Sequence, residues 1–187
     1  MDNHSKKSYP PVAPELSNCS LRALAADSNA ALVQTARELL LEYGRFVAAQ
    51  PTVASFCYGD LEKEAAELPQ SYLRQHGGTI VAFRSREAIG FIAWRTLPAP
   101  ELASAWEIKR LWIRPQARGI GLGRILVQEV IRRALEAGKS QLLLDTEPNS
   151  MAAAHRLYIE MGFSECPSYN GPAKPGIVYM HKELETL

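Results

Sequence analysis

The feature that most constrains the fold is an apolar strand that leads through a glycine-rich turn into a long helix. The strand candidate covers residues 105–113, and the helix continues to about Ala137. The alternating glycines of the turn are Gly119, Gly121 and Gly123. The first N–H groups of such a helix lack intrahelical partners and lie at its positive end, and glycine lets an anion approach the main chain. The segment therefore predicts a pyrophosphate site, to which Arg118 and Arg124 add positive charge.

Two better-known phosphate loops do not match this turn. A dinucleotide fingerprint G-x-G-x-x-G fails because Arg124 stands three residues after Gly121. The tripeptide Gly138-Lys139-Ser140 resembles the end of a nucleotide-binding P-loop, but Arg133 occupies the position of the first glycine. A glycine-rich connection without any ligand stays open as the alternative, because glycine also serves strand–helix turns for steric reasons.

Two motifs surround the long helix. Residues 116–121 read QARGIG and fit the pattern Q/R-x-x-G-x-G/A, while residues 154–163 read AHRLYIEMGF and fit A-x-x-L-Y-x-x-x-G-F. In these residues the chain resembles the GNAT (GCN5-related) N-acetyltransferases, whose coenzyme A signature is the first motif. The stretch from Glu107 to Phe163, which contains both motifs, makes up about a third of the chain. The resemblance implies acetyl-CoA as cosubstrate and an acetyl group moved to an amine.

The resemblance also implies a fold. We expect an α/β (α+β) GNAT fold with a single mixed, mostly antiparallel sheet of six to seven strands, about four flanking helices and a strand splay at the acetyl-CoA site. The hydrophobic pattern itself predicts strands over residues 18–23, 79–83, 89–97, 105–113, 141–145 and 177–180. It predicts a first helix from the caps Asp27 and Ser28 to Tyr43, whose end Gly44 loosens. It predicts further helices over 61–68, from the glycine turn to about 137, and over 150–161. The strand–helix–strand–helix order predicts neighbouring parallel strands.

The expected cofactor contacts come from the resemblance. It implies that the backbone at Leu111, Trp112 and Ile113 pairs with the pantetheine arm, and that the amides of residues 119–124 hold the pyrophosphate. The family often has an asparagine at the start of the last helix, and here Asn149 lies near that place, although Met151 stands at the position itself. The expected cofactor-binding residues are Leu111, Trp112, Ile113, Arg118, Gly119, Ile120, Gly121, Leu122, Gly123, Arg124 and Asn149.

Acetyl transfer needs a deprotonated amine and a proton for the departing thiolate. Glu107 is the candidate base, placed on the same sheet face as Lys109, Leu111 and Ile113 if the strand is unbroken; the alternative is a solvent-facing glutamate paired with Lys109 or a neighbouring strand. Tyr158, in the L-Y pair of the second motif, is the candidate acid. Its alternative is a packing role in a core stripe.

The remaining sequence sets limits on domains and metals. We predict a disordered N-terminal tail over 1–17, because it holds three prolines among polar residues, and one acetyltransferase domain over 18–187. The three cysteines lack C-x-x-C spacing and the four histidines lack metal-ligand spacing, so no metal site is expected. Without a leader or a long apolar stretch, a cytoplasmic protein with no membrane association is expected.

Partners follow from charge and from the resemblance. A formal net charge of +1 gives no general attraction to nucleic acid, so none is expected. We predict a small primary amine as acceptor, attacking the thioester directly, with Tyr169 and Asn170 as candidate acceptor-site residues. The alternatives are acetylation of a protein N-terminus or lysine, and a non-catalytic acyl-CoA-binding regulator. The chain is compatible with a homodimer, and the identity of the amine is not readable from the sequence.

Overall fold

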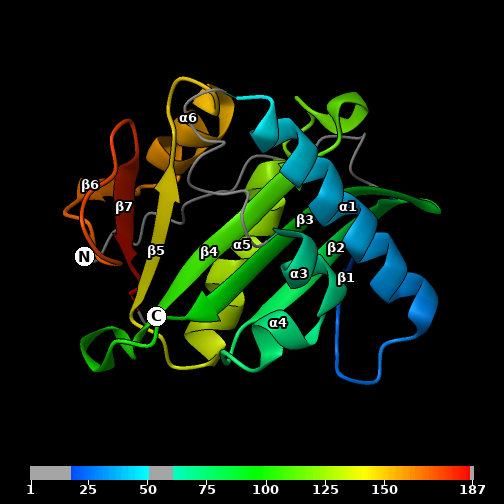
Figure 1. Cartoon of the computed structure of the whole chain (residues 1–187), viewed down its shortest axis with the longest axis horizontal. Helices are drawn as coiled ribbons and strands as arrows, with labels where there is room; N and C mark the ends of the chain where they lie inside the picture. Colours follow the sequence, from blue (N-terminus) through cyan, green and yellow to red (C-terminus); the bar gives the residue numbers. More distant parts are fainter. Residues whose placement is uncertain (1–17, 51–60, 186–187) are drawn as a thin grey trace, which may run out of the picture.

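A computed structural model of the chain describes residues 18–50 and 61–185, which form one seven-stranded sheet (Figure 1). The strands are β1 (Cys19–Ala23), β2 (Gly78–Arg84), β3 (Glu87–Thr96), β4 (Ala105–Ile113), β5 (Gln141–Thr146), β6 (Ser164–Cys166) and β7 (Val178–Glu183). Their spatial order is β1-β2-β3-β4-β5-β7-β6. Among the strands of the described residues, only β4 and β5 pair in parallel. The expected mixed, mostly antiparallel sheet and the parallel pair are thus confirmed; the proposed tail over 1–17 lies outside the described residues.

Helices cover both faces of the sheet (Figure 1). One face carries α1 (Ala30–Ala48), α3 (Leu61–Ala66) and α4 (Gln70–Leu73), and the other carries α5 (Leu122–Glu136) and α6 (Ala152–Glu160). Two single 3₁₀ turns, η2 (Pro100–Leu102) and η3 (Pro115–Ala117), flank β4. The central strands are therefore buried on both sides, which explains why β2 and β3 read as nearly continuous apolar runs.

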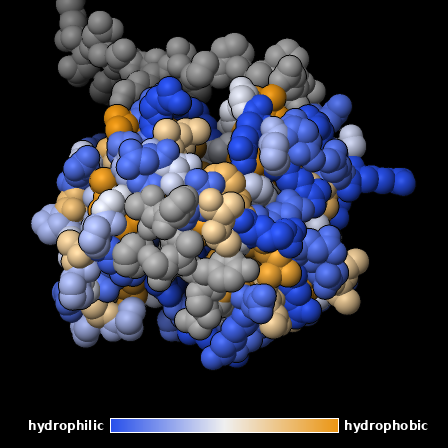
Figure 2. Space-filling model, turned by 45° about the horizontal axis from the view of Figure 1, so that its top comes forward, coloured by the Kyte–Doolittle hydropathy of each residue, from blue (hydrophilic) through white to orange (hydrophobic). Residues whose placement is uncertain are grey.

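The apolar side chains form a separate core on each face. On the α1 side the core includes Leu39, Leu40, Phe91 and Trp112, and on the α5 side it includes Leu126 and Val130. Among the described residues, Ile159 is the large apolar side chain classed as exposed. Figure 2 shows apolar groups separated by polar ones on the face it presents. A smaller third cluster consists of Leu97, Ala105 and Leu143.

A β-bulge at Arg110 interrupts β4. Phe91 of β3 faces Trp112, whereas Ala93 faces Lys109, so two steps on β3 match three on β4. Arg110 takes up the extra residue with a φ of +59°. The sequence has no glycine at this point from which the bulge could have been predicted.

The bulge reverses the alternation of side chains along β4. Glu107 and Lys109 share the α1 face of the sheet with Trp112, whereas Leu111 and Ile113 pack against the core on the α5 face. The expectation that Glu107 and Lys109 share a face with Leu111 and Ile113 is therefore wrong, because the strand is not unbroken.

Beyond Glu107 the two parallel strands separate. Ladder pairs join β4 to β5 only from Ala105 with Gln141 to Glu107 with Leu143, and the strands diverge from there in Figure 1. The strand splay that was expected is present, and after Glu107 no strand of residues 18–50 or 61–185 pairs with the β5 side of the β4 backbone.

Helix ends differ from the sequence-based predictions. The N-cap of α1 is Asn29, whose side chain accepts the Leu32 N–H at 2.9 Å, rather than Asp27 or Ser28. The helix continues through Gly44, where a Cβ atom would lie 3.3 Å from Leu61 Cδ1. Gly44 therefore allows α1 and α3 to pack closely instead of ending the helix.

Three shorter elements also differ. The helix predicted over 61–68 ends at Ala66, and α4 follows as a separate turn. The last helix begins at Ala152 rather than at residue 150. Strand β6 was not predicted, because it has three residues and a largely exposed, polar sequence.

Candidate active site

A groove of about 490 Å³ runs along the carboxyl end of β4 and the start of α5. We call it the α5 groove. Of the predicted cofactor residues it is lined by Leu111, Trp112, Ile113, Arg118, Gly119, Gly121, Leu122, Gly123 and Arg124. Ile120 is not part of the lining and packs against the core instead.

The glycine turn has the geometry that the anion prediction requires. Gly119 and Gly121 have φ angles of +80° and +87°, and Gly121 is the N-cap of α5. A Cβ atom at Gly123 would lie 3.1 Å from Leu157 Cδ2, so this glycine lets α6 approach α5. The first N–H groups of α5 have no carbonyl partner within the helix and lie in the groove wall. The chain's residues thus fit a phosphate-bearing ligand.

The two arginines beside the turn differ in their contacts. The Arg118 guanidinium lies 5.1 Å from the centre of the Trp112 ring, and its Nε donates to the Ile113 carbonyl at 3.1 Å. Arg124 pairs with Glu160 at 2.6 Å across the groove rim. The Arg118 side chain is therefore held in the groove wall, while the charge of Arg124 is partly neutralised by a neighbour.

Asn149 is exposed and lies outside the lining of the α5 groove. Its backbone N–H donates to Glu147 Oε1 at 3.1 Å, which shapes the turn before α6. Ser150 and Met151 line the groove at this end. The structure therefore places the two following residues, rather than Asn149, where the cofactor contact was predicted.

A small cavity of about 60 Å³ adjoins the groove and contains Tyr158. We call it the Tyr158 cavity. It shares Tyr43, Leu111, Met151 and Ala154 with the α5 groove. Tyr158 is 5% exposed, and its burial raises the pKa of the phenol above the ordinary range. The phenol therefore keeps its proton at neutral pH.

A third cavity, of about 560 Å³, adjoins the Tyr158 cavity on the other side. We call it the polar cavity, because most of its lining side chains are charged or polar. The residues common to both cavities are Lys109, Arg110, Asp145 and Lys174. The small Tyr158 cavity thus shares one wall with the α5 groove and another with the polar cavity.

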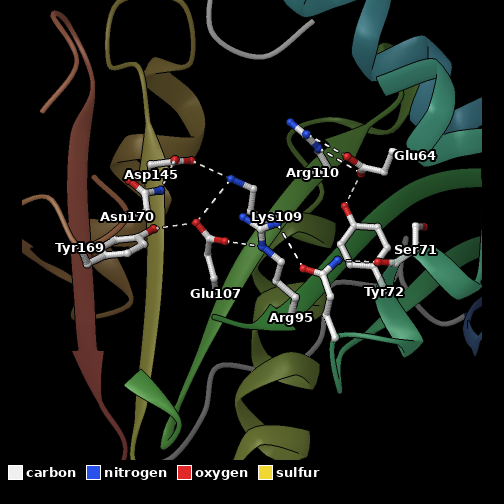
Figure 3. Close-up of polar contacts among 11 residues, drawn as sticks. Glu64, Ser71, Tyr72, Arg95, Glu107, Lys109, Arg110, Asp145, Tyr169 and Asn170 are labelled. Atoms are coloured by element: carbon white, nitrogen blue, oxygen red, sulfur yellow. Dashed lines mark hydrogen bonds and ion pairs between the residues drawn. The ribbon is translucent and has the colours of Figure 1, made fainter. Parts of the chain in front are cut away.

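A row of alternating charges lies along the sheet beside the polar cavity (Figure 3). Lys109 Nζ contacts Asp145 Oδ1 at 3.3 Å and Glu107 Oε1 at 3.4 Å. Arg95 Nε donates to Glu107 Oε2 at 2.7 Å. The four residues come from β3, β4 and β5, so the row depends on the order of these strands.

Two members of the row, Lys109 and Asp145, keep their charges at neutral pH. Burial alone would lower the pKa of Lys109, but the charges of Asp145 and Glu107 outweigh it and raise that pKa. Burial alone would raise the pKa of Asp145, but the charge and hydrogen bond of Lys109 hold it below its usual value. Lys109 is therefore a cation and Asp145 an anion near pH 7.

Glu107 itself has no exposed surface and lines none of the three cavities. Besides Arg95 and Lys109, it accepts a hydrogen bond from the Tyr169 hydroxyl at 3.1 Å. Neighbouring Asn170 donates to Asp145 Oδ2 at 3.4 Å. The two residues that the sequence suggested for the acceptor site thus both contact the charged row.

A second polar group, absent from the sequence-based predictions, lies beside the row in Figure 3 and also lines the polar cavity. Arg110 donates to both Glu64 oxygens, from Nε at 3.2 Å and from Nη2 at 2.9 Å, and the Tyr72 hydroxyl also donates to Glu64. Charged residues inside apolar strands, such as Lys109, Arg110 and Asp145 at the end of LLLD, were the available signal. Their partners are 36 and 46 residues away.

Over the described ranges, no group of three histidine, cysteine or acidic residues is placed to hold a metal ion. In the same residues, no helix combines the length and apolar character that crossing a membrane requires.

Comparison with known proteins relates the chain to acetyltransferases. The family described as "Acetyltransferase (GNAT) family" matches residues 33–163. An uncharacterized N-acetyltransferase of Schizosaccharomyces pombe is 34% identical over 129 residues, which are 68% of this chain and 76% of that protein. N-acetyltransferase 8F1 of Rattus norvegicus is 31% identical over 124 residues, 65% of this chain, and the match spans only 54% of the rat protein.

Solved structures agree with the fold. The acetyltransferase yncA from Salmonella typhimurium, solved with its cofactor acetyl-CoA, has a TM-score of 0.68 at 18% identity, covering 91% of this chain and 96% of that one. A ribosomal-protein-alanine N-acetyltransferase from Brucella melitensis has a TM-score of 0.67 at 24% identity, covering 88% of this chain and 99% of that one.

Proposed function

Because the chain belongs to the GNAT family of acetyltransferases and takes its acetyl group from acetyl-CoA, we propose that it acetylates the primary amine of a small molecule by direct attack. One observation carries this proposal. The small Tyr158 cavity has the α5 groove on one side and the polar cavity on the other, an arrangement suited to two ligands that meet at one point.

In this proposal the α5 groove holds acetyl-CoA. The unpaired β5 side of β4 at Leu111–Ile113 is suited to bind the pantetheine amides as an added strand would. The N–H groups from Gly119 to Arg124 then face the pyrophosphate, and Arg118 adds a charge from the groove wall. Ser150 and Met151 take the place that was expected for Asn149. The thioester, when bound, supplies the activated acetyl group.

Tyr158 is proposed as the proton donor. Its phenol lies in the Tyr158 cavity and its raised pKa keeps the proton in place until a thiolate forms. The steps balance as follows: the ammonium gives up one proton to water, and the neutral nitrogen bonds to the acetyl carbon while the carbon–sulfur bond breaks. The sulfur takes the proton of Tyr158, and the second proton lost by the nitrogen restores the phenol through solvent.

Glu107 enters the proposal as a positioning residue rather than as the base. It is buried, paired with two cations and outside all three cavities, which favours the paired-glutamate alternative. Asp145 is the carboxylate of the row that lines both the Tyr158 cavity and the polar cavity. We propose that Asp145, as an anion, holds the incoming ammonium and that the proton leaves to water.

The first experiment is a calorimetric titration with acetyl-CoA followed by a thiol-release screen over polyamines, amino acids, aminoglycosides and short peptides. Binding with thiol release from a small amine supports the proposal. Release with peptides alone would favour protein acetylation instead, and binding without release would favour the non-catalytic alternative. The cytoplasmic location and a homodimer stay predictions, checked by fractionation and by light scattering.

A further inference from the structure

Cations outnumber acidic groups around the polar cavity. The six cationic residues that line it are Lys63, Arg74, Arg95, Lys109, Arg110 and Lys174, and the three acidic ones are Glu64, Glu67 and Asp145. Glu107, buried behind the lining, raises the acidic number to four. Among the described residues, the cavity therefore carries a surplus of two positive charges. Clefts lined by one sign of charge concentrate ligands of the opposite sign.

Three of these cations are partly buried. The side chains of Lys109, Arg110 and Arg95 are 14%, 12% and 31% exposed. Water screens a charge less at such positions than on an open surface, so an anion brought next to them is bound more strongly. The surplus is thus a property of the cavity wall rather than of distant surface residues.

The cations differ in how far their donors are already used. Both donors of Arg110 that face Glu64 are occupied, and Lys109 bridges Asp145 and Glu107. Arg95 donates from Nε to Glu107 and from Nη1 to Gln75, the second hydrogen bond being 3.4 Å long. A guanidinium has five N–H donors in a planar fork, so Arg95 retains donors that match a carboxylate or a phosphate.

Resting on the proposed function, we propose that the acceptor is an amine that also carries an anionic group, and that Arg95 binds this group. Asp145 holds the ammonium at the junction with the Tyr158 cavity, and Arg95 binds the anion at the other end of the row, beyond Lys109 and Glu107. A zwitterion with a carboxylate or a phosphate complements both ends, whereas a polyamine brings no anion to the remaining donors of Arg95. The acetyl transfer itself is unchanged.

The test compares matched amines with the wild-type chain and saturating acetyl-CoA. The pairs are phenylalanine with phenethylamine, lysine with cadaverine, and phosphoethanolamine with ethanolamine. We expect kcat/KM to be roughly 10- to 100-fold higher for the anionic member of at least one pair, the usual range for a charge-assisted contact. A preference in the first two pairs indicates that the site binds a carboxylate, and a preference in the third pair indicates that it binds a phosphate.

Two variants then assign the preference to Arg95. Arg95→Gln should collapse the ratio within the preferred pair, and Arg95→Lys should restore part of it because it keeps the charge without the fork. Arg84→Gln is the matched control, since Arg84 is also a strand arginine paired with a glutamate and is 34% exposed. It lies outside the polar cavity, so the ratio should not change.

The outcomes separate this inference from the proposed function. Equal or better turnover of the amines without an anion overturns the inference and leaves small-amine acetylation standing. A preference that survives in a folded Arg95→Gln protein overturns the role of Arg95. Acetyl-CoA binding without turnover of any pair overturns the proposed function as well. The amine pairs are compared with the wild-type protein, so this comparison can overturn the inference even if Arg95→Gln does not fold.

Discussion

Arg95 Nε lies 2.7 Å from Glu107 Oε2, and the Glu107 side chain has no exposed surface. Two adjacent strands thus hold a buried carboxylate between cations, and the sheet fixes the carboxylate's position. This relationship decides what Glu107 contributes. A carboxylate that lines none of the three cavities does not reach a bound amine, but it is well suited to hold Lys109 and Arg95 in place.

Glu107→Gln should therefore change stability and affinity more than the pH dependence. Leaving the partly buried Arg95 without its anion should lower the free energy of unfolding by about 1–3 kcal/mol. The apparent pKa values of the kcat/KM profile should stay where they are, because Glu107 lies outside the three cavities and does not contact the amine. Urea unfolding and a pH–rate profile measure the two effects. Glu165→Gln, an exposed change on β6, is the control; loss of the acidic limb in Glu107→Gln alone would restore Glu107 as the base.

Much of the groove was predictable from sequence because its determinants are local. Gly119 and Gly121 are followed directly by a helix, and their positive φ angles are a requirement that few other residues meet. The signal for Gly44 was misleading for a physical reason. Glycine ends many helices because it lacks a Cβ atom, but at Gly44 the missing Cβ makes room for Leu61 of another helix.

The polar cavity was not predictable because its determinants are distant in sequence. Arg110 adopts a positive φ without being glycine, and its partner Glu64 lies 46 residues away. The bulge decides which face of β4 each later side chain occupies, and no periodicity argument detects one inserted residue. The contact of Asp145 with Lys109 likewise exists only once β5 lies beside β4.

Tyr158→Phe should reduce kcat by roughly 10²-fold while the affinity for acetyl-CoA is kept, because the ring stays and only the proton donor is lost. Calorimetry and steady-state kinetics check this. Tyr179→Phe is the matched control, since Tyr179 is also buried and its hydroxyl has no hydrogen-bond partner among the described residues. A Tyr158→Phe protein as active as the control would leave Tyr158 with its packing role.

The pH dependence of the wild-type enzyme should agree with this assignment. Burial raises the pKa of Tyr158, so the neutral phenol persists above its usual titration range. Activity should therefore not fall through loss of this proton below about pH 10. The measurement is kcat against pH with saturating substrates. A decline near neutral pH that disappears in Tyr158→Phe would contradict the raised pKa.

Gly121→Ala should weaken acetyl-CoA binding through the backbone. Gly121 has a φ of +87° at the start of α5, and a side chain there costs about 1–2 kcal/mol and shifts the N–H groups of the turn. Gly138→Ala is the control, because Gly138 has a φ of +70° at the opposite end of the same helix. Both variants should lose similar stability in urea, but only Gly121→Ala should raise the Kd for acetyl-CoA, by roughly 10-fold or more.

Glu42 should make stability depend on pH. Its carboxylate accepts hydrogen bonds from Trp112 Nε1 at 3.2 Å and from two Arg114 nitrogens at 3.0 and 2.7 Å, and so ties α1 to the end of β4. Burial alone would raise the pKa of Glu42, but these contacts hold it below the usual value. A lowered pKa stabilises the fold above the unfolded-state pKa near 4.5, and the contribution is lost as the pH falls further.

Glu42→Gln should therefore be less stable than wild type at pH 7 by about 1 kcal/mol, with the difference shrinking toward pH 3. Urea unfolding across this range measures it, beside the exposed Glu38→Gln as control. A constant difference at all pH values would show that the contact contributes through packing rather than through charge.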